Sequence, residues 1–489
     1  MTWQHGYHTD SPYTCGFYRE LAPAWLDFAS LLQGQLPPRS RSGEAFSYLE
    51  LGSGMGLGLC LLAATHPEGK FTGIDFKPDH ILHSRRLAKD LELDNVRFIE
   101  ADFLSLAEDL GELKDRHQYV VAHGIATWIT QPVQRALLCV AAAALQPGGL
   151  FYCSYNTFPG WLNAVPLQKL AWHLAGTGLP AVEALRQASS QLSALLGTEE
   201  SPSALAMTLP NLRGRVTQMA NLDSTYLCQE YINGGWQPLM VTEMHQRAAE
   251  FKLSFVASAT LPENFLGLLP DVVRSTVLAE TDPTRRLMLQ DLAVNQSFRR
   301  DVLVRGRLGT RMPELWSAIH NLNLRLFDAP ALETYRFETS LGVVTCNPDH
   351  CRAVEQALAA GPRRFGDLVG ELKIAQEVLV EVVALLTHAQ RLGFDRGNAG
   401  KAALNRVKKV NTTLRSMQLQ GRSYTHLASA YAGTGVTFAH VENLLLEQTE
   451  PEQIEKKLQA IGYRLNGDPA VNAEVFANRR PRLAALGMF

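Results

Sequence analysis

The sequence predicts an α/β fold: a doubly wound, mostly parallel sheet with helices on both faces. Three observations predict it. Short apolar segments alternate with amphipathic ones from Phe46 onward, the first apolar segment ends in a glycine turn, and acidic residues follow the next two. Such alternation implies right-handed crossovers between parallel strands that helices cover on both faces. We expect strands at Phe46–Leu51, Lys70–Asp75, Asn95–Ala101, Gln118–His123 and Gly149–Tyr155, and helices at 57–66, 78–93, 104–115 and 131–145.

The segments around this core, residues 46–162, differ from it in pattern. Residues 1–45 contain a helical lead-in, and residues 163–225 lose the strand rhythm, which predicts a helical insertion or cap. Residues 226–311 contain two more strand-like runs, so we expect this segment to complete a seven-stranded sheet with an antiparallel edge pair. The two runs are Leu253–Ala259 and Asp301–Arg307.

Residues 312–489 are expected to form a separate, mainly helical module. Three helical segments are followed by Gly393-Phe-Asp-Arg396, a pattern that resembles a winged helix. The three segments are Glu355–Ala360, Phe365–Leu372 and Glu377–Leu392.

Composition narrows the classes of function. The 489 residues are 46% hydrophobic and 19% charged, with a formal net charge of -2. A near-neutral chain has no strong field to attract nucleic acid, which disfavours nucleic acid as a partner. The N-terminus lacks the pattern of a signal peptide and no apolar run could span a bilayer, so we expect a cytoplasmic protein without membrane insertion. The seven cysteines include no CxxC pair, and no set of ligands suggests a metal site.

The first predicted strand ends in the turn Glu50-Leu-Gly-Ser-Gly-Met-Gly56. Glycine lets the backbone pass close to a ligand. A dinucleotide site needs G-x-G-x-x-G, but the positions for its third glycine are Leu57 and Leu59. The G-x-G-x-G spacing after an acid suits a zwitterionic amino-acid ligand, although alone it could equally be a structural turn. The expected ligand contacts are Glu50, Gly52, Ser53, Gly54 and Gly56.

Two acids at predicted strand ends strengthen this interpretation. Asp75 ends the second strand, where a carboxylate can accept both hydroxyls of a ribose, and Phe76 follows it. Asp102 follows the third strand beside Phe103, whose ring can pack on an adenine. A single Asp at either place would more often be a helix N-cap. The ordered series of glycine turn, Asp75 and Asp102 predicts an S-adenosylmethionine site.

With these motifs the chain resembles the class I S-adenosylmethionine-dependent methyltransferases, and more narrowly the bacterial family that carries a methyltransferase regulatory domain. Members of that family include protein-lysine methyltransferases that act on outer-membrane proteins. The likeness covers most of residues 10–307 and, more loosely, the C-terminal part. It departs at Gln229-Glu230, where the family usually has His-Glu. The segments that carry it are Val121–Trp128, Leu145–Trp161, Tyr226–Glu230, Trp236–Pro238 and Phe298–Gly306.

The resemblance implies roles for individual residues. The acid and glycines of the turn would hold the methionine end of the cofactor, Asp75 the ribose and Asp102 the adenine. His123 and Gly124 would end the fourth strand beside the methyl donor, and Tyr13 is expected to reach the methionine end.

The acceptor site is expected at the rim after the fifth strand. Tyr155 and Asn156 would hydrogen-bond an acceptor amine, and Trp128 or Trp161 would stack against an alkyl-ammonium. His123 or Tyr155 would take the proton, so His123, Tyr155 and Asn156 are the catalytic candidates. The alternatives are that Trp161 anchors the cap and that His123 is a core histidine.

The leading prediction is methylation of a protein or peptide, foremost on lysine amines, because the cap and the C-terminal module suit a bulky acceptor. A second interpretation is a methyltransferase for small molecules or natural products, whose extra domains would serve homodimerisation. A third is a regulator that binds S-adenosylmethionine without turnover and uses its winged-helix-like part on DNA. The near-neutral charge disfavours the third.

Overall fold

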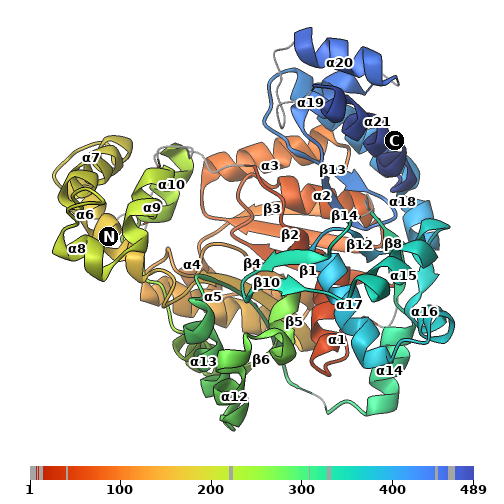
Figure 1. The fold of residues 1–489 in the computed structure, drawn as a ribbon, viewed down its shortest axis with the longest axis horizontal. Helices are drawn as coiled ribbons and strands as arrows, with labels where there is room; N and C mark the ends of the chain where they lie inside the picture. Colours follow the sequence, from red (N-terminus) through yellow and green to blue (C-terminus); the bar gives the residue numbers. More distant parts are fainter. Residues whose placement is uncertain are drawn as a thin grey trace.

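A computed structural model of the protein describes residues 7, 9, 15–39, 42–219, 224–307, 309–327, 332–446, 450–460 and 469–489. Its centre is a seven-stranded sheet in the order β3-β2-β1-β4-β5-β7-β6 (Figure 1). The strands are β1 (Phe46–Leu51), β2 (Gly69–Asp75), β3 (Val96–Glu100), β4 (His117–Ala122), β5 (Leu145–Asn156), β6 (Leu253–Ser258) and β7 (Phe298–Arg305).

The first five strands run parallel to one another, while β7 runs antiparallel to both of its neighbours, β5 and β6. This confirms the predicted α/β sheet and its edge pair. The crossover helices are α2 (Leu57–Thr65), α3 (Pro78–Asp90), α4 (Phe103–Glu108) and α5 (Gln131–Ala144). The helix expected over 104–115 is shorter than predicted, because the backbone turns extended at Asp109, with a φ of -145°, and a 3-10 turn, η2 (Gly111–Leu113), follows.

A lead-in precedes the sheet and a helical cap follows β5. The lead-in consists of η1 (Arg19–Leu21) and α1 (Pro23–Leu32), which packs against the sheet. The cap stands to one side of the sheet (Figure 1) and has an apolar core of its own. The domain boundary expected at 225/226 falls inside its last helix. The cap helices are α6 (Val165–Gly176), α7 (Ala181–Leu195), α8 (Ala204–Thr208), α9 (Asn211–Met219) and α10 (Ser224–Tyr231).

Three helices accompany the edge strands: α11 (Val241–Ala249), α12 (Asp271–Ala279) and α13 (Pro283–Val294). Beyond them, a small sheet of order β11-β8-β12 lies among helices that include the three helical segments predicted there, and we call this part the winged-helix-like unit. A hairpin of β9 and β10, which was not predicted, lies beside it. The elements are α14 (Met312–His320), β8 (Asn323–Leu326), β9 (Arg336–Thr339), β10 (Gly342–Thr345), α15 (Pro348–Ala359), β11 (Arg363–Arg364), α16 (Phe365–Leu372), α17 (Gln376–His388) and β12 (Leu392–Phe394).

The end of the chain, which the sequence predicts to be a separate module, packs directly on the core of residues 46–162. Helix α2 buries eight of its nine residues, because α18, β13 and β14 cover the side that the sheet leaves open. The Arg396 guanidinium reaches the Thr65 carbonyl and the Glu68 carboxylate on the core. The last elements are α18 (Asn398–Leu419), β13 (His426–Ser429), β14 (Thr434–Thr437), α19 (His440–Leu445), α20 (Pro451–Ala460) and α21 (Pro469–Ala485).

Candidate active site

The glycine turn after β1 has the backbone geometry that its sequence predicts. Gly52, Gly54 and Gly56 have φ values of 76°, 52° and 77°, a region that residues with a side chain rarely adopt. At Gly56 a Cβ would lie 2.5 Å from the Ser84 Oγ, so the turn also needs the missing side chain for space. The turn is therefore held close to α3 and leaves its outer backbone free to approach a ligand.

Two polar groups beside this turn suit an amino-acid ligand. Desolvation raises the pKa of Glu50 to about 8, with a further contribution from Asp75. Within the described ranges nothing hydrogen-bonds the Glu50 carboxyl, and the buried Ser53 hydroxyl has no partner there either. Both residues line one recess with the glycine turn. A bound ammonium would pair with the Glu50 carboxylate, and an acceptor such as a carboxylate would satisfy the Ser53 hydroxyl.

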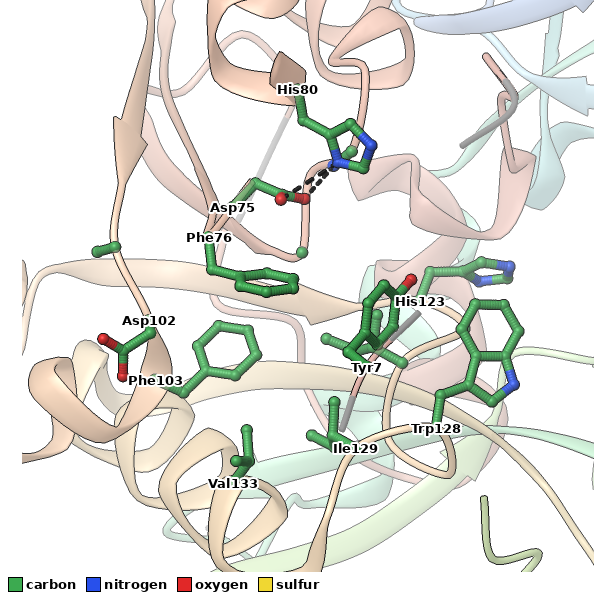
Figure 2. Close-up of a pocket in the computed structure, with 15 residues that line it drawn as sticks. Tyr7, Asp75, Phe76, His80, Asp102, Phe103, His123, Trp128, Ile129 and Val133 are labelled. Atoms are coloured by element: carbon green, nitrogen blue, oxygen red, sulfur yellow. Dashed lines mark hydrogen bonds and ion pairs between the residues drawn. The ribbon is translucent and has the colours of Figure 1, made fainter. Parts of the chain in front are cut away.

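Asp75 lies at the end of β2, facing the turn. Its Oδ2 accepts a hydrogen bond of 2.9 Å from the Gly54 amide, and its Oδ1 accepts one of 2.9 Å from the Lys77 amide. His80 Nδ1 lies 3.2 Å from the same Oδ1 (Figure 2). Since a carboxylate offers about four acceptor positions, the side chain is held in place and still has capacity for a ligand hydroxyl.

Asp102 lies in the same cleft but also caps a helix. Its Oδ1 accepts from the Ser105 amide at 3.0 Å and its Oδ2 from the Ser105 hydroxyl at 2.8 Å, so it is the N-cap of α4. The alternative that Asp102 is a helix N-cap is therefore correct, and Asp102 also lines the cleft. Phe103 directly after it and Phe76 after β2 face an apolar slot together with Ile129 and Val133 (Figure 2).

These groups line one cleft with about 810 Å³ of empty space, open solvent at its mouth included. Tyr7, from the N-terminal segment, closes over it and meets the Phe76 ring edge-on at 5.5 Å (Figure 2). The Lys77 ammonium holds this segment through the Thr9 carbonyl at 2.9 Å. Tyr7 was not predicted from the sequence, because no local pattern shows that its ring packs against Phe76.

His123 and Gly124 follow β4 and lie in the cleft as expected. The His123 ring is sandwiched between aromatic groups: Tyr18 stacks on it with centroids 3.6 Å apart, and its Nδ1 lies 2.9 Å from the Tyr152 hydroxyl. Burial lowers the pKa of His123 to about 3, with the positive charge of Arg300 contributing. The ring is therefore neutral near pH 7 and a poor acceptor for a proton from an amine.

The Glu230 carboxyl on α10 is buried and pairs with the residue that ends β5. The Asn156 Nδ2 donates a hydrogen bond of 2.9 Å to Glu230 Oε1 from α10. Burial raises the pKa of Glu230, against hydrogen bonds from Asn156 and Tyr226. Burial raises the pKa of Tyr7, and the charges of Asp75 and Glu230 raise it further. Trp128 lines the cleft beside Tyr7 (Figure 2).

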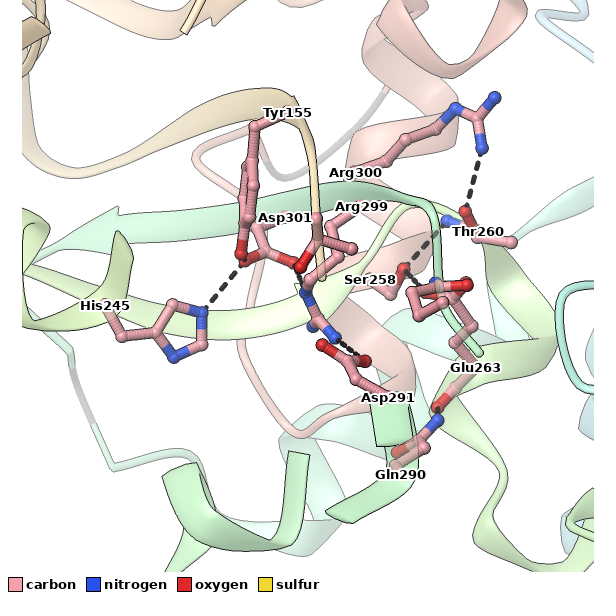
Figure 3. A network of polar contacts seen from close by, with 12 residues as sticks. Tyr155, His245, Ser258, Thr260, Glu263, Gln290, Asp291, Arg299, Arg300 and Asp301 are labelled. Carbon is pink, nitrogen blue, oxygen red and sulfur yellow. Dashed lines mark hydrogen bonds and ion pairs between the residues drawn. The ribbon is translucent and has the colours of Figure 1, made fainter. Parts of the chain in front are cut away.

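Two expected acceptor contacts lie elsewhere. Side chains alternate across a strand, so Tyr155 points away from the face that Asn156 occupies. It is fully buried and its hydroxyl donates to Asp301 Oδ2 at 2.7 Å (Figure 3). Trp161 packs in the cap core, with the Arg215 guanidinium 4.5 Å from its ring, which fits the alternative that it anchors the cap. Tyr13 lies outside the described residues.

The described helices include none that is both long and apolar enough to cross a membrane. Among the same residues, no cluster of His, Cys, Asp or Glu is arranged to hold a metal ion.

Comparisons with known proteins agree with this architecture. Residues 42–189 match the family model "Methyltransferase domain", and residues 223–305 match "Predicted methyltransferase regulatory domain". The Synechocystis sp. protein named "Uncharacterized protein sll1526" is 30% identical over 459 residues, which cover 93% of this chain and 89% of the relative. A Rickettsia prowazekii protein, "Uncharacterized protein RP028", is 30% identical over 154 residues, 32% of this chain and 59% of the relative.

The structure of PKMT2 from Rickettsia typhi in complex with AdoHcy superposes with a TM-score of 0.68 at 18% identity, covering 97% of this chain and 99% of that one. That likeness shows a shared fold over almost the full length. From the two matched domains and the full-length relative, we conclude that the chain belongs to the family of S-adenosylmethionine-dependent methyltransferases that carry the methyltransferase regulatory domain.

Proposed function

We propose that this enzyme methylates lysine amines of a protein acceptor, and that Glu230 receives the amine. The observation that carries the proposal is the buried Glu230 carboxylate, oriented by Asn156 and next to Tyr226 and Tyr7. A desolvated carboxylate among aromatic rings suits an alkyl-ammonium, which it attracts by charge while the rings pack on the alkyl chain. The sequence resemblance to protein-lysine methyltransferases agrees with this choice.

The cofactor assignment follows the geometry of the cleft. Glu50 would pair with the cofactor ammonium, Ser53 with its carboxylate, and Asp75 with the ribose. Phe76 and Phe103 would enclose the adenine in their apolar slot. S-adenosylmethionine supplies a methyl group already activated on a sulfonium, so the protein chiefly orients the acceptor and excludes water.

The protein must also deprotonate the acceptor, because a lysine side chain has an ordinary pKa of about 10.4 and only the neutral amine is nucleophilic. Burial raises the pKa of Glu230, which makes its carboxylate a better proton acceptor than an exposed one. The sequence predicts His123 or Tyr155 as the group that takes this proton, but burial lowers the pKa of His123 to about 3, which makes its ring a weaker base than the Glu230 carboxylate. We assign His123, stacked under Tyr18, to positioning at the cleft wall.

The test uses methyl-labelled cofactor with heat-denatured proteins and, separately, the small-molecule fraction of a bacterial lysate. Label on lysines, located by mass spectrometry of the digested proteins, supports the proposal. Label confined to small molecules would contradict it and favour the small-molecule alternative.

Glu230→Gln then tests the residue. It keeps the shape and the hydrogen-bonding oxygen but cannot accept the proton, so we expect kcat to fall about 100-fold or more with cofactor affinity unchanged. Glu371→Gln, an exposed acid that pairs with Arg363 on the winged-helix-like unit, is the matched control. A wild-type kcat in Glu230→Gln would show that Glu230 is not the group that accepts the proton.

A further inference from the structure

A second cavity adjoins the active site, between the N-terminal lead-in, β7, the winged-helix-like unit and the β13–β14 hairpin. It has about 1040 Å³ of empty space, open solvent included. We propose that this interdomain cavity binds the carboxylate of an Asp or Glu side chain that flanks the target lysine of the acceptor protein. The proposal rests on the proposed lysine methylation and extends it to the choice of acceptor.

The interdomain cavity and the recess at the glycine turn share the Tyr18 ring as part of their walls. This ring stacks at 3.6 Å on His123, which lines the cofactor cleft. An acceptor segment with its lysine at the cleft therefore has room for a neighbouring side chain on the other side of Tyr18.

The wall of this cavity carries a surplus of positive charge. Arg299 and Arg300 are adjacent on β7 and extend in different directions (Figure 3). Arg299 is neutralised by Asp291 at 2.6 Å and Asp301 at 2.9 Å. Arg300 lines the interdomain cavity instead.

Arg300 shares its counter-ion with a second arginine. Glu20 lies 3.9 Å from Arg300 Nε and 3.7 Å from Arg19 Nε, so one carboxylate faces two guanidinium groups and neither distance is that of a direct hydrogen bond. The cavity also contains His426, but burial lowers the pKa of that ring to about 4, so it adds no charge near pH 7. One positive charge thus stays uncompensated among the described groups of the wall.

Several donors there have no partner. Arg300 Nη1 donates to the Thr260 hydroxyl at 3.2 Å and Arg19 Nη2 to the His388 carbonyl at 2.6 Å. In the described chain no hydrogen-bond partner exists for Arg300 Nε or Arg19 Nη1, nor for the hydroxyl groups of two lining threonines, Thr387 and Thr434. Guanidinium groups match the two oxygens of a carboxylate, which makes this chemistry the best fit.

The arrangement favours a carboxylate carried by a polypeptide. Apolar side chains complete the wall, and the volume exceeds what a small anion would fill. Their presence suits a side chain together with part of its backbone. These apolar residues are Phe17, Trp25, Phe327 and Phe394.

The experiment measures methyl transfer to a synthetic peptide library with one central lysine and randomised flanks. We expect the wild-type enzyme to select an acidic residue at one fixed spacing from the lysine. Arg300→Gln should lower kcat/KM for the selected acidic peptide about 10- to 100-fold, mainly through KM, and leave the rate on its Glu→Gln counterpart unchanged. Arg300→Lys, which keeps the charge but loses the planar fork, should fall in between.

Arg19→Gln is the second variant, and Arg352→Gln, an exposed arginine that pairs with Asp349 and does not line this cavity, is the control. Cofactor affinity and thermal unfolding show that each variant is folded. A wild-type enzyme without acidic preference, or the same preference in Arg300→Gln and Arg19→Gln, would overturn the inference while lysine methylation stands.

Two further outcomes also count against it. If a free dicarboxylate such as glutarate changes the rate equally on all peptides and Arg300→Gln abolishes that change, the cavity binds a free carboxylate and the acceptor assignment is wrong. If the wild-type enzyme modifies no lysine in any peptide while it binds cofactor normally, the proposed function itself fails.

Discussion

The two halves of the active site are built in different ways. The cofactor half uses residues that follow three consecutive strands, so each lies next to its own strand end in the sequence. The proposed acceptor half joins Asn156 on β5 to Glu230 on α10, 74 positions later, and adds Tyr7 from the start of the chain. In this proposal local motifs define the methyl-donor site, whereas long-range packing defines the acceptor site.

The largest effect is expected in the cofactor half. Asp75→Ala removes the acceptor for the Gly54 and Lys77 amides together with the proposed ribose contact. We expect the Kd for S-adenosylmethionine, measured by titration calorimetry, to rise about 100-fold or more, because two buried donors and the ligand lose a charged partner. Asp79→Ala, an exposed acid on α3, is the control. Equal affinity in both variants would show that the cleft holds the cofactor in another way.

A smaller effect is expected on the pH dependence of cofactor binding, which involves the cofactor half alone. The pKa of Glu50 is raised to about 8, so below that pH the carboxyl is mostly protonated and must lose its proton to pair with the cofactor ammonium. Affinity should therefore increase more than about tenfold from pH 6 to 8 and decline above, where the α-amino group itself loses its proton. Titrations across this range provide the measurement. In Glu50→Gln the rise below pH 8 should vanish; a persistent rise would assign it to another group.

The smallest effect on rate is expected from a residue that the sequence placed in the acceptor half. Tyr155→Phe removes only the hydroxyl that donates to the buried Asp301, which keeps Arg299 and His245 as partners. We expect kcat to stay within about twofold and the free energy of unfolding to fall by about 1–3 kcal/mol. Chemical denaturation and initial rates measure the two quantities. A large loss of kcat with unchanged stability would show that the Tyr155 hydroxyl takes part in the reaction.

The sheet could be predicted from the sequence because each buried parallel strand is an apolar run between turn residues. β1 has the predicted bounds, and the edge pair β6 and β7 was found although it lies about 100 residues beyond the other strands. The hairpins β9–β10 and β13–β14 were missed, since strands of four residues carry too little periodicity to detect. The packing of α18 on α2 was missed as well, although the almost uniformly apolar sequence of α2 indicated that something covers both of its faces.

The site divides in the same way. The sequence by itself determined that the glycine turn, Asp75 and Asp102 lie close together at one edge of the sheet, because the carboxyl ends of parallel strands meet there. Only the tertiary structure decided that Asn156 pairs with Glu230 of α10 while Tyr155 pairs with Asp301, and that Tyr7 lines the cleft. The physical reason is that side-chain alternation shows which residues share a face, but only the packing of distant segments decides which face becomes the active site.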